Sequence, residues 1–107
     1  MKVTAGELDQ LITLESPVVT TDAWGGEVET WLIEAQAYAR VTEARGREFL
    51  KGDYKAEEKA VFKIRWREVD STWRVNWGGR TWRIESVTGM LREGARWIHC
   101  TAQGEAN

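Results

Sequence analysis

The residues with the greatest chemical capacity are a histidine and a cysteine that follow one another, His99 and Cys100. Imidazole and thiolate are preferred zinc ligands, and the same two groups supply base and nucleophile in many hydrolases. Neighbouring residues of a strand point to opposite faces, so these two cannot serve one site if the stretch is a strand. We expect one of them in the core and the other exposed.

The sequence contains no other complete set of catalytic residues. His99 is the single histidine, and the pairs Gly25-Gly26 and Gly78-Gly79 have the spacing of hairpin turns, not of a phosphate-binding loop that opens a helix. The adjacent carboxylates Glu57-Glu58 lie among other charges, with nothing apolar nearby to raise a pKa. The sequence therefore predicts a protein that is not an enzyme and that holds no metal and no cofactor.

Seven tryptophans in 107 residues are the unusual feature of the composition. Aromatic side chains interleaved with arginine can form a stacking platform for single-stranded nucleic acid, which makes a nucleic-acid-binding β-barrel the alternative function. Trp24 and Trp31 bracket a turn, and exposed tryptophan is enriched at binding hot spots, so these two are candidate partner anchors. The residues of the platform hypothesis are Trp66, Trp73, Trp77, Trp82 and Trp97 with Arg65, Arg67, Arg74 and Arg83.

The stretch from Trp73 to Val87 predicts a β-hairpin closed by Gly78-Gly79. In that register Trp77 faces Arg80, Val75 faces Trp82 and Arg74 faces Arg83. The like charges of Arg74 and Arg83 are unfavourable, and we expect Glu85, diagonal to Arg74, to offset them. One face then collects Trp73, Val75, Trp77, Trp82 and Ile84, and the arginines take the other. Core packing is therefore the better explanation of these tryptophans.

Further strands follow from alternation of apolar and polar residues. The run 11–15 is prone to form a strand that Pro17 ends or demotes to an edge, and residues 18–21 could extend it past the proline. A short strand at 27–31 returns after the turn at 22–26. Residues 34–43 and 61–67 alternate at period two, and 95–102 forms the last strand. Thr4 and Glu7 have the spacing of a capping box, which predicts one helical turn.

Residues 44–60 break this alternation. They hold two glycines and many charges but few large apolar groups, so the sequence predicts a long functional loop. The fold class is accordingly all-β. We expect one domain over 1–107, a small β-barrel or sandwich of six to seven mostly antiparallel strands, with one long loop and at most a short helical turn.

The net charge of −2 hides an asymmetry between the two ends of the chain. Residues 1–42 hold seven acidic against two basic side chains, and residues 60–107 hold five against eight. Acidic and basic faces of this kind can meet between neighbouring subunits. An acidic chain argues against duplex recognition by phosphate contacts. No apolar run reaches the length of a membrane span and no signal peptide is apparent, so we expect neither membrane association nor export.

Short motifs follow one another along most of the chain: Gly6-Glu7-Leu8, Ile12-Thr13-Leu14, Asp22 with Gly25-Gly26, Glu29-Thr30-Trp31, Ala39-Arg40-Val41, Gly46-Arg47-Glu48-Phe49, Gly79-Arg80 and the run from Trp82 to Val87. In this order they resemble the head-closure proteins of tailed phages, also called head-tail joining or head-tail adaptor proteins. The resemblance extends from about residue 4 to residue 101. It departs at Asp9-Gln10-Leu11, where relatives usually carry basic residues, and in the number of tryptophans.

The resemblance implies a structural protein of the virion neck, or of a prophage or gene-transfer particle, that is made in the host cytoplasm. Such proteins form a ring of six or twelve copies beneath the portal and its adaptor, retain the packaged double-stranded DNA and offer the tail-completion protein a docking surface. A monomer is compatible with the free protein. In this family the long loop points to the channel, and residues 44–59 match it by position. The loop residues expected to contact neighbours or DNA are Arg45, Arg47, Glu48, Phe49, Leu50, Lys51 and Tyr54.

Overall fold

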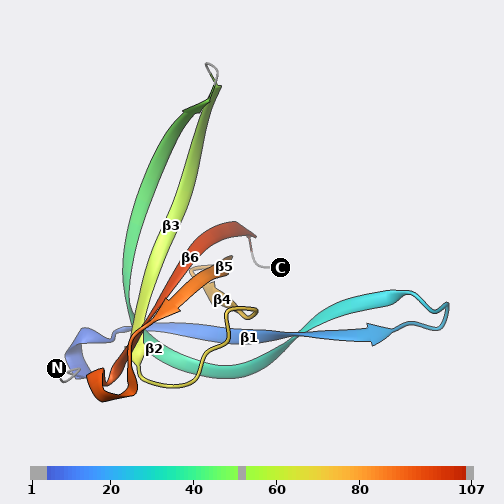
Figure 1. The fold of residues 1–107 in the computed structure, drawn as a ribbon, viewed down its shortest axis with the longest axis horizontal. Helices are drawn as coiled ribbons and strands as arrows, with labels where there is room; N and C mark the ends of the chain where they lie inside the picture. The colour runs from blue at the N-terminus through green and yellow to red at the C-terminus, as the bar shows by residue number, and fades with distance from the viewer. Residues whose placement is uncertain (1–4, 51–52, 106–107) are drawn as a thin grey trace.

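The computed structural model describes residues 5–50 and 53–105, with the backbone alone for 5, 44–50, 53–57 and 104–105. Six antiparallel strands form one sheet that closes into a barrel in the order β1-β2-β3-β6-β5-β4 (Figure 1). Two 3-10 turns, η1 (Ala5–Glu7) and η2 (Leu91–Glu93), complete the described elements. The strands are β1 (Gln10–Thr21), β2 (Glu27–Leu50), β3 (Asp53–Arg65), β4 (Arg74–Trp77), β5 (Arg80–Thr88) and β6 (Ala95–Glu105). The all-β prediction is confirmed.

The predicted hairpin of β4 and β5 is confirmed in its register. Trp77 pairs with Arg80, Val75 with Trp82 and Arg74 with Arg83. Gly78 and Gly79 have φ of 63° and 74°, the left-handed values that a two-residue turn between antiparallel strands requires. β4 then closes the barrel by pairing with only three residues of β1, 13–15.

The barrel interior is apolar and centred on Trp82, which is 1% exposed. Its ring meets Phe62 edge-on at 5.8 Å between centroids, and its Nε1 donates a hydrogen bond to the Trp77 carbonyl at 3.3 Å. Trp73 and Trp77 pack against the same cluster. The fully buried side chains around them include Ile12, Leu14, Phe62, Ile64, Val75 and Ile98. The prediction that indoles fill the core is therefore confirmed for this hairpin.

The prediction of a long loop over 44–60 is wrong. β2 continues to Leu50 and β3 begins at Asp53, and the two pair antiparallel without interruption from Ala39 with Ile64 to Leu50 with Asp53. The backbone hydrogen bonds of a ladder do not depend on apolar alternation, which is needed only where one face of the sheet is buried. Residues 45–58 extend past the end of the β3–β6 pairing at Lys59, so the barrel core sets no alternation in their sequence.

β1 runs through Pro17 to Thr21 and pairs with β2 throughout, which confirms the extension past the proline over 18–21. Pro17 lies beyond the three residues that touch β4, where β1 is an edge strand, as the proline predicts. β2 accordingly is one strand over Glu27–Leu50, not the two segments that the sequence predicts at 27–31 and 34–43. The result is a small barrel from which two hairpins project.

Candidate functional site

Two strand pairs extend beyond the barrel, and they point in different directions (Figure 1). The first, here the acidic arm, comprises residues 16–32, the ends of β1 and β2 past the contact with β4. The second, here the second arm, comprises residues 45–58 of β2 and β3. In the described part of the chain, neither arm has a third strand beside it. These unpartnered hairpins are the most conspicuous candidates for contact with other molecules.

The tip of the acidic arm is held by hydrogen bonds that centre on Asp22. Its Oδ1 accepts from the backbone N–H of Trp24 at 2.9 Å and of Gly26 at 2.8 Å, and its own N–H donates to the Gly26 carbonyl at 2.8 Å. Gly25 supplies the positive φ of 82° that the turn needs. Trp24 is therefore presented on an ordered turn, with its side chain 95% exposed.

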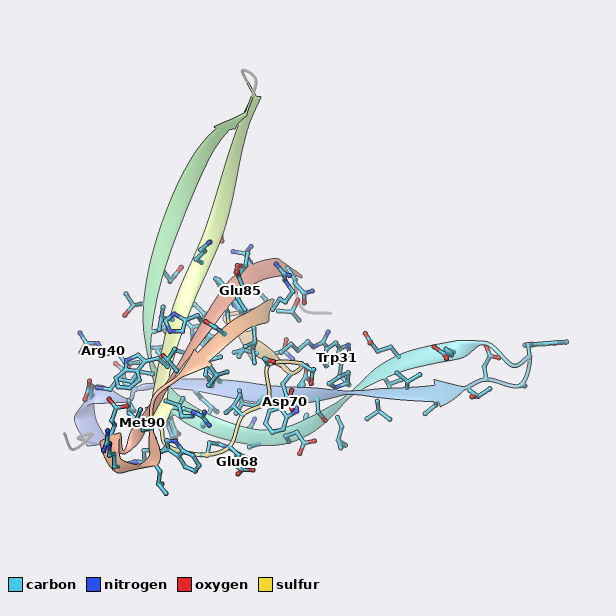
Figure 2. The ribbon with its side chains drawn as sticks, in the orientation of Figure 1. Trp31, Arg40, Glu68, Asp70, Glu85 and Met90 are labelled. Carbon is cyan, nitrogen blue, oxygen red and sulfur yellow. The ribbon has the colours of Figure 1, made fainter. Side chains whose placement is uncertain are left out.

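Trp31 lies at a different kind of position, on the base of the acidic arm (Figure 2). The guanidinium of Arg74 stacks over its ring at 4.2 Å and also forms an ion pair with Glu15, Nε to Oε1, at 2.6 Å. The charge of Arg74 is thus paired by Glu15, and not by Glu85 as the sequence predicts. Of the two predicted anchors, Trp24 is free and Trp31 supports the seam where β4 closes on β1.

Both faces of the acidic arm carry exposed apolar side chains. A β-bulge places the extra residue Glu34 between the pairs Leu14–Ala35 and Glu15–Ile33. The register therefore changes, and the adjacent residues Leu32 and Ile33 are 55% and 61% exposed. The sequence held a signal for this surface that strand periodicity does not capture: consecutive large apolar residues on one strand cannot both point into a core.

The predicted channel residues map onto the second arm by their backbone. Arg45, Arg47, Glu48, Phe49 and Leu50 belong to β2 and Tyr54 to β3, while Lys51 lies outside the described residues. The ladder pairs Phe49 with Tyr54 and Glu48 with Lys55. These residues are therefore brought together near the end of one hairpin, which the sequence alone did not predict.

A pocket of about 390 Å³ opens on the barrel where β2 passes the end of β3. Its apolar walls come from Leu8, Tyr38 and Trp66, and Arg65 and Arg67 supply its charge. The side chain of Arg65 makes no hydrogen bond or ion pair within the described chain, and Arg67 donates Nε–H to the Glu68 carbonyl at 3.1 Å. Gln36 and Ala37 complete the lining. The sequence does not predict this pocket, because its walls come from three segments that only the barrel closure brings together.

Beside the pocket, Glu7 joins η1 to the barrel. Its Oε1 accepts from Lys63 Nζ at 2.6 Å and lies 3.5 Å from Arg40 NH1. The hydrogen bond from Lys63 holds the pKa of Glu7 below its ordinary value. The helical turn is as predicted, but its carboxylate serves the barrel, and the expected partner Thr4 lies outside the described residues.

The soft ligands behave as predicted. Cys100 is 3% exposed in the core, and burial raises the pKa of its thiol to about 12. His99 lies on the other face, with Nε2 3.1 Å from Thr88 Oγ1. Among the described residues, no three His, Cys, Asp or Glu side chains cluster as metal ligands, and no helix is long and apolar enough to span a membrane.

The described tryptophans do not form an open stacking platform. All seven lie in the described part of the chain, and Trp24 alone is exposed. Several are already covered by cations of the same chain, with Arg96 over Trp66 at 5.1 Å and Lys63 over Trp97 at 5.6 Å. The described residues therefore offer no row of open indole faces on which nucleic-acid bases could stack.

Comparison with known proteins decides the family, because the sequence model described as "Phage head completion protein" matches residues 3–105. The chain belongs to this family. A protein in the virion of a native gene transfer agent particle is 25% identical, with a TM-score of 0.64 over 92% of this chain and 96% of that one. Protein SF1141 from Shigella flexneri 2a shares the fold at 22% identity, with a TM-score of 0.70 over 97% and 100% of the two chains.

No curated protein matches the sequence. Membership of the head completion family makes the chain a structural protein of the head-tail region of a phage or phage-like particle, and a virion component. A structural role in a particle also favours a protein without catalytic activity. The resemblance seen in the sequence motifs is confirmed.

Proposed function

We propose that the chain forms a closed ring in the neck of the particle, beneath the portal and its adaptor, where it retains the packaged DNA and offers the tail a docking surface. The observation that carries this proposal is the pair of arms. The molecule measures 51 × 42 × 23 Å, a large span for 107 residues, because both hairpins leave the barrel without a third strand of their own chain beside them in its described part. Such hairpins are suited to contacts with other subunits.

A ring needs two different patches on each subunit, because its contacts are head-to-tail. The acidic arm provides one, with Asp22, Glu27 and Glu29 and no Lys or Arg anywhere from residue 11 to residue 39. The barrel provides the other, because the positive charge of the chain lies mainly in residues 60–107. Complementary charge of this kind fixes which surfaces meet and in what orientation. A ring of six or twelve copies is the expected product.

The second arm is assigned to the channel. Its backbone carries Arg45, Arg47 and Lys55 alongside Glu48 and Glu57, a mixed charge that touches DNA without binding it so tightly that passage stops. No sequence readout is needed for this task, since duplex DNA passes through as a uniform polyanion. Phe49 and Tyr54, paired across the hairpin, are the residues we assign to contacts between neighbouring arms.

Deletion of the gene in its phage or prophage, followed by complementation, tests this function. Without the protein we expect DNA-filled heads that lack tails and lose DNA, and wild-type protein supplied from a plasmid restores infectious or transducing particles. Finished particles that appear normal without the protein would contradict the neck role.

Limited proteolysis tests the place of the second arm in the assembly. We expect a protease to cleave residues 43–59 in the free protein. In purified particles, where neighbouring copies or the channel wall would cover them, we expect the same residues to be protected. A matched control is the turn at Glu68–Thr72, which we expect to be cut less because Asp70 holds it through the Thr72 N–H and hydroxyl, both at 2.8 Å. Equal cleavage of 43–59 in both states would argue against subunit contacts there.

A further inference from the structure

Trp24 is 95% exposed, so its indole contributes almost nothing to the packing of the fold. It sits at the end of the acidic arm on a turn fixed by four hydrogen bonds, so little conformational freedom is lost when it binds. A fully exposed indole gains a large apolar area on burial, which is why tryptophan is frequent among the residues that dominate interfaces. The arm therefore presents a rigid aromatic anchor.

The pocket bounded by Leu8, Tyr38 and Trp66 is a fitting receptor for such an anchor. Its volume of about 390 Å³ lies within the range of pockets that hold small ligands, roughly 300–1,000 Å³. Its walls are apolar and aromatic, and its charge comes from Arg65 and Arg67.

The charges on the two sides are complementary. Glu27 and Glu29 flank the tip and make no ion pair within the described chain, and neither does Arg65 at the pocket. Because these charges give up no ion pair of their own chain when the surfaces meet, their attraction can orient one surface on the other. This argues for an occupant with an acidic, tryptophan-bearing tip, which is the chemistry of the arm itself.

The arm cannot reach the pocket of its own chain. β2 runs continuously from Glu27 at the tip to Gln36 at the pocket rim, a strand of about 30 Å at ~3.3 Å per residue. Figure 1 shows the arm leading away from the barrel, with its tip at the far end. An arm that enters this pocket must therefore come from a second copy.

We propose that the acidic arm of each copy docks on the next copy, with Trp24 inserted between Tyr38 and Trp66 and the arm carboxylates facing Arg65 and Arg67. The contact is head-to-tail, because tip and pocket lie on different parts of the molecule, and repetition of it closes a ring or extends a chain. This proposal rests on the proposed neck function and names the contact that builds the ring.

Disulfide trapping inside assembled particles tests the contact. The variant Ala23→Cys with Gln36→Cys places one thiol at the tip and one at the pocket rim, and both native residues are exposed. Trp24 itself stays in place. Cys100 stays silent because its thiol is buried with a pKa of about 12. We expect mild oxidation to give a ladder of covalent multimers on a non-reducing gel. The control, Ala23→Cys with Arg83→Cys, has its second thiol at an exposed site on β5 and gives no ladder.

The outcomes separate this contact from the neck function. A particle that contains the protein but gives no ladder, or in which the thiol introduced at position 23 joins a different virion protein, overturns the docking proposal and leaves the neck function standing. Wild-type protein absent from particles overturns the neck function itself. The double-cysteine protein is scored beside wild type for incorporation.

Two further variants measure the anchor and the charges separately. Trp24→Ala should weaken self-association about 30-fold, the typical loss at an interface hot spot, and Trp24→Phe should restore part of it. Arg65→Glu with Arg67→Glu should block association, and Glu27→Arg with Glu29→Arg in the same chain should restore it. Unchanged association of Trp24→Ala, or failure of the charge exchange to restore a folded double variant, would overturn the contact.

Discussion

At the scale of the residue, the seven tryptophans divide between opposite tasks. Trp82 is buried and meets Phe62 edge-on, Trp31 is stacked beneath Arg74, and Trp24 is fully exposed at a tip. Burial and cation stacking use the indole within the chain, whereas exposure leaves it for a partner. The composition that suggested a nucleic-acid platform therefore reflects a core and an anchor.

Glu7 makes the stability of the barrel depend on pH. The pKa of Glu7 is lowered in the folded state, chiefly by the hydrogen bond from Lys63. The ionised carboxylate therefore stabilises the fold above the ordinary pKa of about 4.5. This contribution to stability is lost as the pH falls through the folded-state pKa. Wild type should therefore lose more of its urea midpoint between pH 7 and pH 3 than Glu7→Gln does. Glu29→Gln, which removes a carboxylate without an ion pair in the described chain, is the control. Parallel midpoint curves for wild type and Glu7→Gln would show that Glu7 contributes nothing.

At the scale of the element, the sequence predicts those strands that line the core and fails on those that do not. The hairpin of β4 and β5 follows in full from alternation and Gly78-Gly79, because burial on one face fixes its register. Residues 45–58 lie past the end of the β3–β6 pairing, where the barrel core sets no alternation in the sequence. The pocket also could not be predicted, since Leu8, Tyr38 and Trp66 meet only through closure of the barrel.

Substitutions in the turn at Gly78-Gly79 measure how much its conformation contributes to the stability of the protein. Both glycines adopt positive φ, which costs a residue with a Cβ about 1–2 kcal/mol. Gly78→Ala combined with Gly79→Ala should therefore lower the free energy of unfolding by about 2–4 kcal/mol, measured by urea denaturation followed by tryptophan fluorescence. Gly78→Asn is the control, because asparagine tolerates this conformation and Asn-Gly is a preferred turn. A double-alanine variant as stable as Gly78→Asn would exclude a strained turn.

The seam between β1 and β4 depends on one side chain more than on its short ladder. Arg74 pairs with the buried Glu15 at 2.6 Å and covers Trp31, so Arg74→Ala leaves a carboxylate without its partner. We expect a loss of about 2 kcal/mol in the free energy of unfolding, as for a charged hydrogen bond.

Arg83→Ala is the matched control for the seam. Arg83 faces Arg74 across the hairpin but is exposed and makes no ion pair in the described chain, and its removal also relieves a like-charge pair. Arg74→Lys should fall between the two, because lysine keeps the charge and loses the planar stack. Equal losses for Arg74→Ala and Arg83→Ala would mean that the seam is held by the backbone alone.

At the scale of the whole molecule, the barrel holds the bases of the two arms in fixed positions. Closure of the sheet in the order β1-β2-β3-β6-β5-β4 gives each strand a neighbour on both sides along part of its length, whereas the two hairpins keep a free edge in the described part of the chain. The strands that carry the arms are the same strands that line the core, so each arm is fixed at its base. A subunit built in this way can engage a neighbour at a distance while its own fold stays unchanged.

Salt should weaken self-association if acidic arms meet basic barrels. Raising the ionic strength from 0.1 M to 1 M shortens the screening length from about 10 Å to about 3 Å, which reduces the attraction between partly exposed charges. Sedimentation equilibrium over a concentration series should therefore show fewer oligomers of the wild-type protein at high salt. The variant Arg65→Glu with Arg67→Glu should respond in the opposite direction, because salt then screens a repulsion between two acidic surfaces. Association of wild type that rises with salt would instead indicate an interface governed by apolar burial, in which Glu27, Glu29 and Arg65 have no part.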